Sequence, residues 1–99
     1  MRIFNYSTLK AFFGKHTDCE INLRNWYKFI EKQEFENLNE ILKCGYKVSL
    51  LKNNRVCFDI KGNKYRLIVE FDFKFKVALI RFIGTHEEYN SIDANTVSL

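Results

Sequence analysis

Residues 55–71, RVCFDIKGNKYRLIVEF, alternate apolar and polar side chains on either side of the Gly62-Asn63 pair. A period of two is typical of half-buried strands, and Gly-Asn suits a type I′ or II′ hairpin turn. We therefore predict a β-hairpin whose register follows from a two-residue loop. Its apolar pairs share one face, which we expect helices to cover: Ile60 with Tyr65, Phe58 with Leu67, and Val56 with Val69.

The opposite face of this hairpin carries mixed side chains. Its predicted pairs are Arg55 with Glu70, Cys57 with Ile68, and Asp59 with Arg66. Because a strand turns alternate residues to opposite sides, the burial of one face leaves the other in contact with solvent. We expect this largely polar face to be available for function.

Residues 77–85, VALIRFIGT, predict a third strand after a turn near Phe73-Lys74. A two-residue loop there sets Tyr65 opposite Phe82, both facing the core, and Arg66 opposite Arg81 on the outer face. Facing like charges destabilise a sheet unless a negative group lies beside them. With Asp59 as that neighbour, the cluster either satisfies itself or leaves net positive charge for a phosphate, and both interpretations stay open.

The first half of the chain predicts a short strand over 1–6 and then mostly helix. Ser7 or Thr8 is a candidate cap for a helix over 9–16, and TDCE at 17–20 has the form of a capping box. Cys19, Leu23, Trp26 and Ile30 then recur along one helical face. Phe35, Leu38, Ile41 and Leu42 repeat the pattern up to Gly45, which predicts a second long helix.

These elements predict a single α+β domain over residues 1–99. Two helices pack on one face of a small, mostly antiparallel sheet, and a short C-terminal helix follows Thr85. The position of the first strand in the sheet is left open. Arg24, Lys28 and Lys32 form a basic stripe, which we interpret as the solvated side of a helix because acidic residues dilute it.

Composition limits the partners and the location of the chain. Sixteen Lys and Arg against twelve Asp and Glu give a net charge of +4, which favours a polyanion such as nucleic acid. Three widely spaced cysteines predict no disulfide framework, and His16 with Cys19 lacks the further ligands of a zinc site, so core packing is favoured. With no signal peptide and no membrane-spanning run, we expect a soluble cytoplasmic protein without metal or cofactor.

His86 lies where the third predicted strand gives way to THEE, residues 85–88, another capping-box sequence. At the start of a short helix it either caps and packs, or serves as a neutral base or proton donor beside a phosphate. Four further side chains fall near the same end of the two predicted strands: Lys64, Arg66, Arg81 and Tyr89. RNA cleavage without a metal needs a base, cations and an acid, and this group contains each.

The segments VCFDIKGNKYRLIVEF (56–71) and ALIRFIGTHEEYNSIDA (78–94) resemble the HigB family of bacterial type II toxins, which are RelE-related. The motifs Gly-Asn-Lys-Tyr-Arg and Gly-Thr-His-x-Glu-Tyr occur in the same order as in that family. The resemblance implies that the following residues are functional: Asn63, Lys64, Tyr65, Arg66, Arg81, His86 and Tyr89. The chain departs from the family pattern at Asn90, where aspartate is expected, and at Asp59, where asparagine is usual.

The resemblance implies an mRNA interferase that cleaves ribosome-bound mRNA and is neutralised by a HigA-like helix-turn-helix antitoxin. It leads us to expect catalytic roles for Arg66, Arg81, His86 and Tyr89, and RNA binding by Lys61, Asn63 and Lys64. A non-catalytic RNA-binding module and a protein-interaction subunit are the alternatives. The predicted burial of Tyr65 and Phe82 argues against the first, because such modules stack bases on exposed rings. The clustered arginines argue against the second.

Overall fold

The computed structural model describes residues 1–98. Its strands form one sheet in the order β1-β5-β4-β3-β2, with β1 parallel to β5 and the other neighbours antiparallel. The strands are β1 (Arg2–Phe4), β2 (Val48–Leu50), β3 (Arg55–Ile60), β4 (Tyr65–Asp72) and β5 (Val77–Thr85). The helices are α1 (Tyr6–Lys15), the 3-10 helix η1 (Thr17–Cys19), α2 (Glu20–Glu31), α3 (Leu38–Leu42) and α4 (His86–Asn90).

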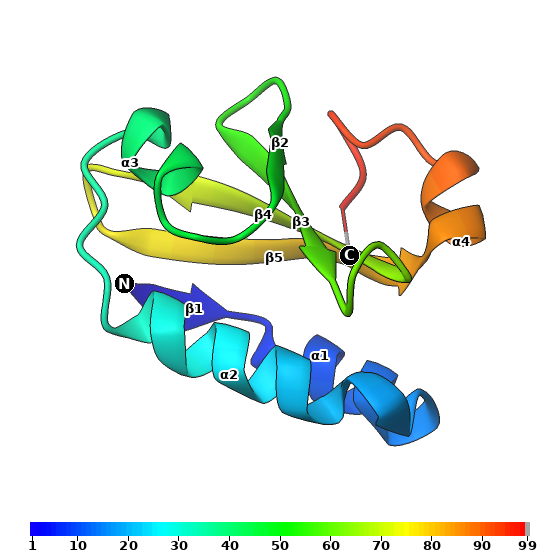
Figure 1. The fold of residues 1–99 in the computed structure, drawn as a ribbon. Coiled ribbons are helices and arrows are strands. Elements are labelled where there is room, and N and C mark those ends of the chain that lie inside the picture. The colour runs from blue at the N-terminus through cyan, green and yellow to red at the C-terminus, as the bar shows by residue number, and fades with distance from the viewer. Residues whose placement is uncertain (99) are drawn as a thin grey trace.

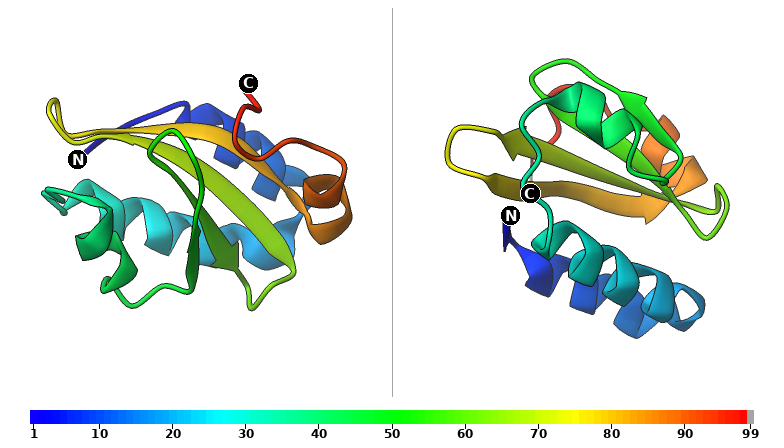
Figure 2. Two further views of the ribbon diagram at one scale, coloured as in Figure 1. Left: turned by 90° about the horizontal axis from the view of Figure 1, so that it is seen from above. Right: turned by 60° about the vertical axis from the view of Figure 1, so that its left-hand side comes forward.

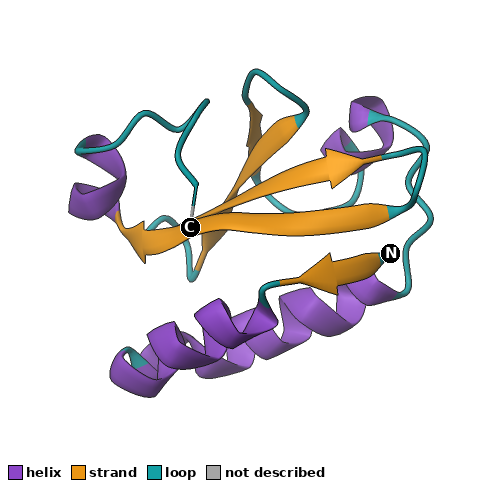
Figure 3. Ribbon diagram, turned by 180° about the vertical axis from the view of Figure 1, so that it is seen from behind, coloured by secondary structure: helices purple, strands orange, loops and turns teal. Residues whose placement is uncertain are grey.

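The arrangement of these elements confirms the predicted α+β class. Helices α1 and α2 lie side by side along one face of the sheet, and α4 follows the end of β5 (Figure 1; Figure 3 shows the same layers from behind). The first strand, whose place the sequence left open, is an edge strand beside β5. None of the helices within residues 1–98 combines the length and apolar character needed to cross a membrane.

The β3–β4 hairpin has the predicted register. Ile60 pairs with Tyr65, Phe58 with Leu67 and Val56 with Val69, and the outer-face pairs are also as predicted. The N–H of Lys64 donates to the carbonyl of Lys61 (3.3 Å), which closes the turn. Gly62 has φ 69°, a conformation that glycine adopts without strain.

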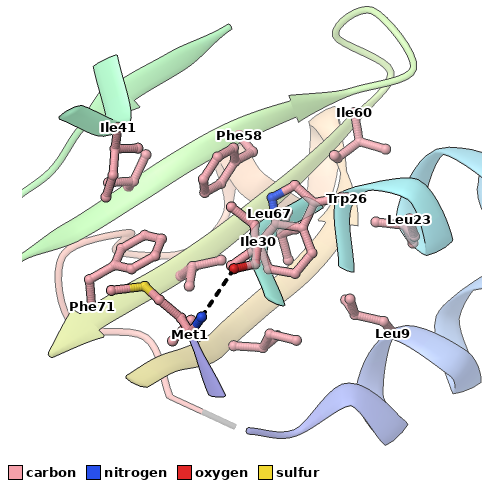
Figure 4. Packing of buried hydrophobic residues seen from close by; sticks show 14 of the residues in the cluster. Met1, Leu9, Leu23, Trp26, Ile30, Ile41, Phe58, Ile60, Leu67 and Phe71 are labelled. Carbon is pink, nitrogen blue, oxygen red and sulfur yellow. Dashed lines mark hydrogen bonds between the residues drawn. The ribbon is translucent and has the colours of Figure 1, made fainter. Parts of the chain in front are cut away.

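Helix α2 covers the apolar face of the hairpin, as predicted. Its residues Leu23, Trp26 and Ile30 are completely buried, and the Trp26 and Phe58 rings are nearly perpendicular, with 5.5 Å between their centroids. Figure 4 shows this layer, with Leu67 beneath the helix. Full burial of each such side chain contributes about 1.5–3 kcal/mol to the free energy of folding. This layer therefore fixes which face of the hairpin points inward.

The predicted register of β5 is wrong. Arg66 lies opposite Gly84 rather than Arg81, and Val69, not Leu67, lies opposite Ile80. The preceding turn is longer than assumed, since β4 ends at Asp72 and β5 begins at Val77. A β-bulge then shifts the pairing again between Ile68 and Val69.

The bulge also changes which side chains face outward. Arg81 has no direct partner in the ladder, Phe82 pairs with Ile68, and Ile83 packs against the core. The ring of Phe82 lies 6.5 Å from that of Tyr89 of α4, so the prediction that Phe82 faces the core is wrong. Two consecutive residues on one side are expected at a bulge, because two residues there oppose one on the partner strand.

Two helix starts differ from the prediction. Helix α1 begins at Tyr6, after Asn5 in the left-handed region (φ 74°), rather than at a Ser7 or Thr8 cap. The predicted capping box at 17–20 is absent: Thr17 opens η1, and α2 begins at Glu20 without a side-chain cap. The side chain of Asp18, the second residue of that box, is bonded instead to Lys64 and Tyr65 of the hairpin.

The second long helix is also absent, because α3 has only five residues. The Asn37 side chain accepts from the N–H of Glu40 (3.1 Å), which starts the helix after Phe35 rather than before it. Phe35 still reaches the core, where its ring meets Phe71 at 6.3 Å. The apolar spacing of residues 35–42 was therefore produced by a buried loop residue followed by a single helical turn.

The outer face of the hairpin is less open than predicted. Cys57 and Ile68 are fully buried, and Arg55 is only 6% exposed. The Arg55 guanidinium donates to the carbonyls of Ala94 (3.3 Å) and Val97 (2.5 Å), which holds the C-terminal segment against the sheet. In Figure 2 this segment returns from α4 alongside the strands.

Gly84 tests the packing beside the bulge. A Cβ there would lie 2.5 Å from Cζ of Phe82 and 3.1 Å from Oε1 of Glu88. Gly84→Ala should displace the Phe82 ring and lower the free energy of unfolding by about 1–3 kcal/mol, measured by urea denaturation. In a Phe82→Leu background, which removes the ring, the same substitution should cost less than half as much. Equal losses in both backgrounds would assign the cost to the backbone instead.

Candidate functional site

An open cleft of about 680 Å³ lies where α1, the β3–β4 turn and α4 meet. Figure 1 shows the end of α1 and helix α4 at the same end of the sheet. The volume is within the range of small-molecule sites. The lining residues come from three separate segments of the chain: His16, Asn63, Lys64, Tyr65, Thr85, His86 and Glu87.

His86 is held at the cleft by its backbone. Thr85 and Glu88 form the predicted capping box, in which the Thr85 hydroxyl accepts from the Glu88 N–H (3.2 Å) and the Glu88 carboxylate accepts from the Thr85 N–H (2.7 Å). The N–H of His86 donates to the carbonyl of Lys64 (3.3 Å), which joins α4 to the hairpin. The imidazole is exposed.

Asn90 contacts the imidazole of His86 directly. Its amide nitrogen lies 3.3 Å from Nδ1 of His86, and as a donor it is matched by the tautomer with its proton on Nε2. An aspartate at this position would instead accept a hydrogen bond from an Nδ1–H group. The departure from the family pattern at Asn90 therefore concerns a group in contact with His86.

A hydrogen-bonded network fixes Lys64 and Tyr65 beside the cleft. The Lys64 ammonium contacts one carboxylate oxygen of Asp18 at 2.5 Å, and the Tyr65 hydroxyl donates to the other at 2.7 Å. These two hydrogen bonds hold the pKa of the Asp18 carboxyl below its usual value. The same carboxylate raises the pKa of Lys64 and that of Tyr65. Lys64 therefore remains a cation in the cleft.

His16, at the end of α1, also lines the cleft. Its ring stacks on that of Phe12 at 4.2 Å between centroids, and lies 5.5 Å from the Tyr65 ring at an interplanar angle of 65°. Cys19 is fully buried, as predicted, but its thiol donates to the backbone carbonyl of His16 (3.2 Å) rather than to the ring. The pairing of His16 with Cys19 in sequence is therefore not a pairing of their side chains.

Arg66 and Tyr89 form a second group on the outer face of the sheet. The Arg66 guanidinium lies 5.2 Å from the centre of the Tyr89 ring, a cation–π geometry. It also pairs with Asp59 at 3.4 Å, and both charged side chains are mostly buried. Burial raises the pKa of the Tyr89 phenol. Neither Arg66 nor Tyr89 lines the cleft itself.

Arg81 lies farther along the outer face than predicted. Its Nε contacts Oε1 of Glu70 at 3.3 Å, and Arg55 contacts the same oxygen at the same distance. The register places it away from Arg66, which faces Gly84. The residues predicted to be catalytic therefore divide into His86 at the cleft, the Arg66–Tyr89 pair, and Arg81 with its own ion pair.

The residues predicted to bind RNA surround the hairpin turn. Lys61, Asn63 and Lys64 are all exposed, and Asn63 and Lys64 line the cleft. Within residues 1–98, no three His, Cys, Asp or Glu side chains converge into a group able to hold a metal ion.

Sequence reasoning did not assign His16 and Asp18 to this site. His16 was attributed to core packing, and Asp18 was read only as part of a helix-capping sequence. Asp18 lies 46 and 47 positions along the chain from its partners Lys64 and Tyr65, and the ring of His16 packs against the same Tyr65. The one sequence signal that could have pointed to His16 was the scarcity of histidine, because the chain has only two. In the structure both of them line one cleft.

The α+β fold, with its mostly antiparallel sheet and a short capped helix after the last strand, is consistent with the RelE-like fold class. Residues 19–92, about three quarters of the chain, match the HigB toxin family, described as the RelE-like toxic component of a toxin–antitoxin system. The chain belongs to this family, and membership implies an antitoxin partner. A comparison with curated proteins gives no match. His16 and Asp18 precede the matched segment.

The Asp18 network predicts a pH-dependent contribution to stability. Since the pKa of Asp18 is lowered on folding, its carboxylate stabilises the fold above the unfolded value, about 4, and this contribution disappears as the pH falls through the folded-state value. Asp18→Asn should therefore unfold at lower urea concentration than the wild type at pH 7, with a difference that shrinks below about pH 4.

Glu34→Gln is the control for loss of one exposed negative charge, and it should show no such pattern. A deficit in Asp18→Asn that is the same at pH 7 and at pH 3 would contradict the charge argument.

Proposed function

We propose that the protein is the toxin of a type II toxin–antitoxin system and acts as a ribosome-dependent, metal-independent endoribonuclease. The observation that carries this proposal is the position of His86, whose exposed imidazole shares an open cleft with Lys64 and Asn63. Membership of the HigB toxin family supports it. A ribosome-bound substrate would place the activity in the cytoplasm.

The cleft contains a cation and a proton-transfer group for the reaction. Cleavage requires removal of the 2′-hydroxyl proton, stabilisation of the charge on the phosphorane, and protonation of the departing 5′-oxygen. Lys64 supplies a fixed positive charge beside His86, because Asp18 holds its ammonium in place. Asn63 supplies an amide at the same wall. His86 is the proposed proton-transfer group.

The outer face provides the proposed path for the RNA backbone. Arg55, Arg66 and Arg81 meet two carboxylates there, Asp59 and Glu70, which leaves one net positive charge. Tyr89 connects this face to the cleft, since it lies in α4 with His86 and contacts Arg66. We propose that Arg66, Arg81 and Tyr89 act on phosphate groups, with the Asp59 pairing reducing the charge available from Arg66.

One observation favours the alternative of a non-catalytic RNA-binding module. Phe82 lies on the outer face with Tyr89, where the two rings are 6.5 Å apart. Stacking of bases on such rings is typical of proteins that bind single-stranded RNA. RNA binding without cleavage would therefore depend on these rings and not on His86. Substitution of His86 thus distinguishes the two functions, because it should abolish cleavage and leave such binding intact.

Substitution of the proposed catalytic residues tests the enzyme function. His86→Gln should lower the rate of mRNA cleavage in a translating extract about a hundredfold or more, because proton transfer is lost. Arg81→Ala and Arg66→Ala should each lower it on the order of a hundredfold, equivalent to roughly 3 kcal/mol of transition-state stabilisation. Growth arrest on induction should weaken in parallel.

Two controls separate loss of activity from loss of structure. Arg24→Ala removes one exposed positive charge from α2 and should cleave normally. Because Arg66→Ala leaves Asp59 unpaired, the double variant Arg66→Ala/Asp59→Asn keeps the charge balance and should remain inactive. If the three single variants His86→Gln, Arg66→Ala and Arg81→Ala all fold and all cleave at the wild-type rate, the enzyme function is rejected.

The antitoxin is proposed to be a HigA-like helix-turn-helix protein that covers the basic surface. With a net charge of +4, attraction to acidic segments should contribute to binding. The dissociation constant of the purified complex should rise roughly tenfold between low and physiological salt, measured by calorimetry. An affinity independent of salt, with a large negative heat-capacity change, would indicate an apolar interface instead.

A further inference from the structure

We propose that His16 is the second proton-transfer residue of the cleft and works with His86 as an acid–base pair in RNA cleavage. This inference rests on the proposed ribonuclease function. It assigns a role to a side chain outside the family-matched segment, residues 19–92. Both imidazoles of the chain line the same cleft, and this juxtaposition carries the proposal.

The two histidines flank one pair of hairpin residues, Lys64 and Tyr65. The backbone of His86 is bonded to the carbonyl of Lys64 at 3.3 Å, and Thr85 is the strand partner of Tyr65. On the other side, the ring of His16 meets the Tyr65 ring at 5.5 Å. A phosphodiester held by the Lys64 ammonium therefore has an imidazole on each side.

Packing fixes the plane of the His16 ring without covering the residue. The ring packs against Phe12, stacked at 4.2 Å, and against Tyr65, and the residue is partly exposed. Within residues 1–98, no hydrogen bond restrains either ring nitrogen. A phenylalanine would provide the same stacking, so packing alone does not explain an imidazole that borders the cleft.

The proposed step balances without a further reactant. One imidazole, neutral, takes the proton of the 2′-hydroxyl as the 2′-oxygen attacks phosphorus. The bond from phosphorus to the 5′-oxygen breaks, and the other imidazole, protonated, gives its proton to that oxygen. The products are a 2′,3′-cyclic phosphate and a 5′-hydroxyl, and the two histidines have exchanged protonation states.

Charged and titratable groups lie on every element that borders the His16 side of the cleft. Lys64 and the Tyr65 phenol lie on the hairpin, with Asp18 of η1 bonded to both. Across the cleft are His86 and Glu87 of α4. A second hollow that His16 also borders contains Lys15 of α1 and Glu88 of α4.

The test uses ribosomes programmed with a short synthetic mRNA in two forms. In one form the scissile linkage has its natural 5′-oxygen, and in the other a bridging sulfur replaces that oxygen. A thiolate leaves without protonation, so the sulfur form does not need a general acid. Wild type, His16→Gln, His16→Phe and His86→Gln are compared, with Lys10→Gln on the exposed side of α1 as control. His16→Phe keeps the aromatic stack if His16→Gln unfolds.

On the oxygen form, both His16 variants and His86→Gln should cleave about a hundredfold or more slower than wild type, and Lys10→Gln should match wild type. The sulfur form should restore cleavage in either the His16 variants or the His86 variant, but not in both, which identifies the acid. The bell-shaped pH dependence of the wild type should lose one limb when His16 is replaced and the other when His86 is replaced.

Other outcomes overturn the pair in distinguishable ways. Wild-type rates in folded His16→Phe, or sulfur rescue of both positions or of neither, would reject His16 as a catalytic residue while a cleaving wild type retains the proposed function. A wild type that cuts neither form would reject the ribonuclease function and the pair together.

Discussion

The burial of one face of the β3–β4 hairpin beneath α2 is the constraint on which the rest of the structure depends. Since alternate residues of a strand point to opposite sides, a slip of one residue would move Phe58, Leu67 and Val69 to the outer face and turn Asp59 and Arg66 toward the apolar layer beneath α2. The apolar layer excludes that alternative. It thereby assigns the arginine of β4 to the outer face and places the turn, with Lys64, at the end where α1 and α4 meet.

The hairpin could be predicted because its information is local. Alternation, turn composition and cross-strand pairing all lie within residues 55–71, and each favours the same register. The pairing of β5 could not be predicted in this way. Its register depends on a four-residue turn and on a bulge, and neither changes the apolar content of the strand. The prediction of a second long helix failed for a related reason, since Phe35 reaches the core from a loop and only residues 38–42 are helical.

The part of the candidate site that comes from neighbouring strands could be predicted, and the part that comes from the packing of distant helices could not. Asn63, Lys64 and His86 fall beside one another because the hairpin turn and the end of β5 are neighbours in the sheet. Asp18 and His16 reach the same place only because α1 and η1 end over the hairpin. That arrangement follows from the packing of two helices on a sheet, for which residues 9–20 contain no short-range signal.

The bulge in β5 has a consequence for how the strand tolerates mutation. Before it, even-numbered positions are the internal ones, since Ala78 and Ile80 are completely buried. After it, the internal position is odd, because Ile83 packs against the core while Phe82 faces α4. A single strand thus contains two opposite parities of core-facing side chains, so a polar substitution should disrupt the core at Ala78 and Ile80 before the bulge and at Ile83 after it.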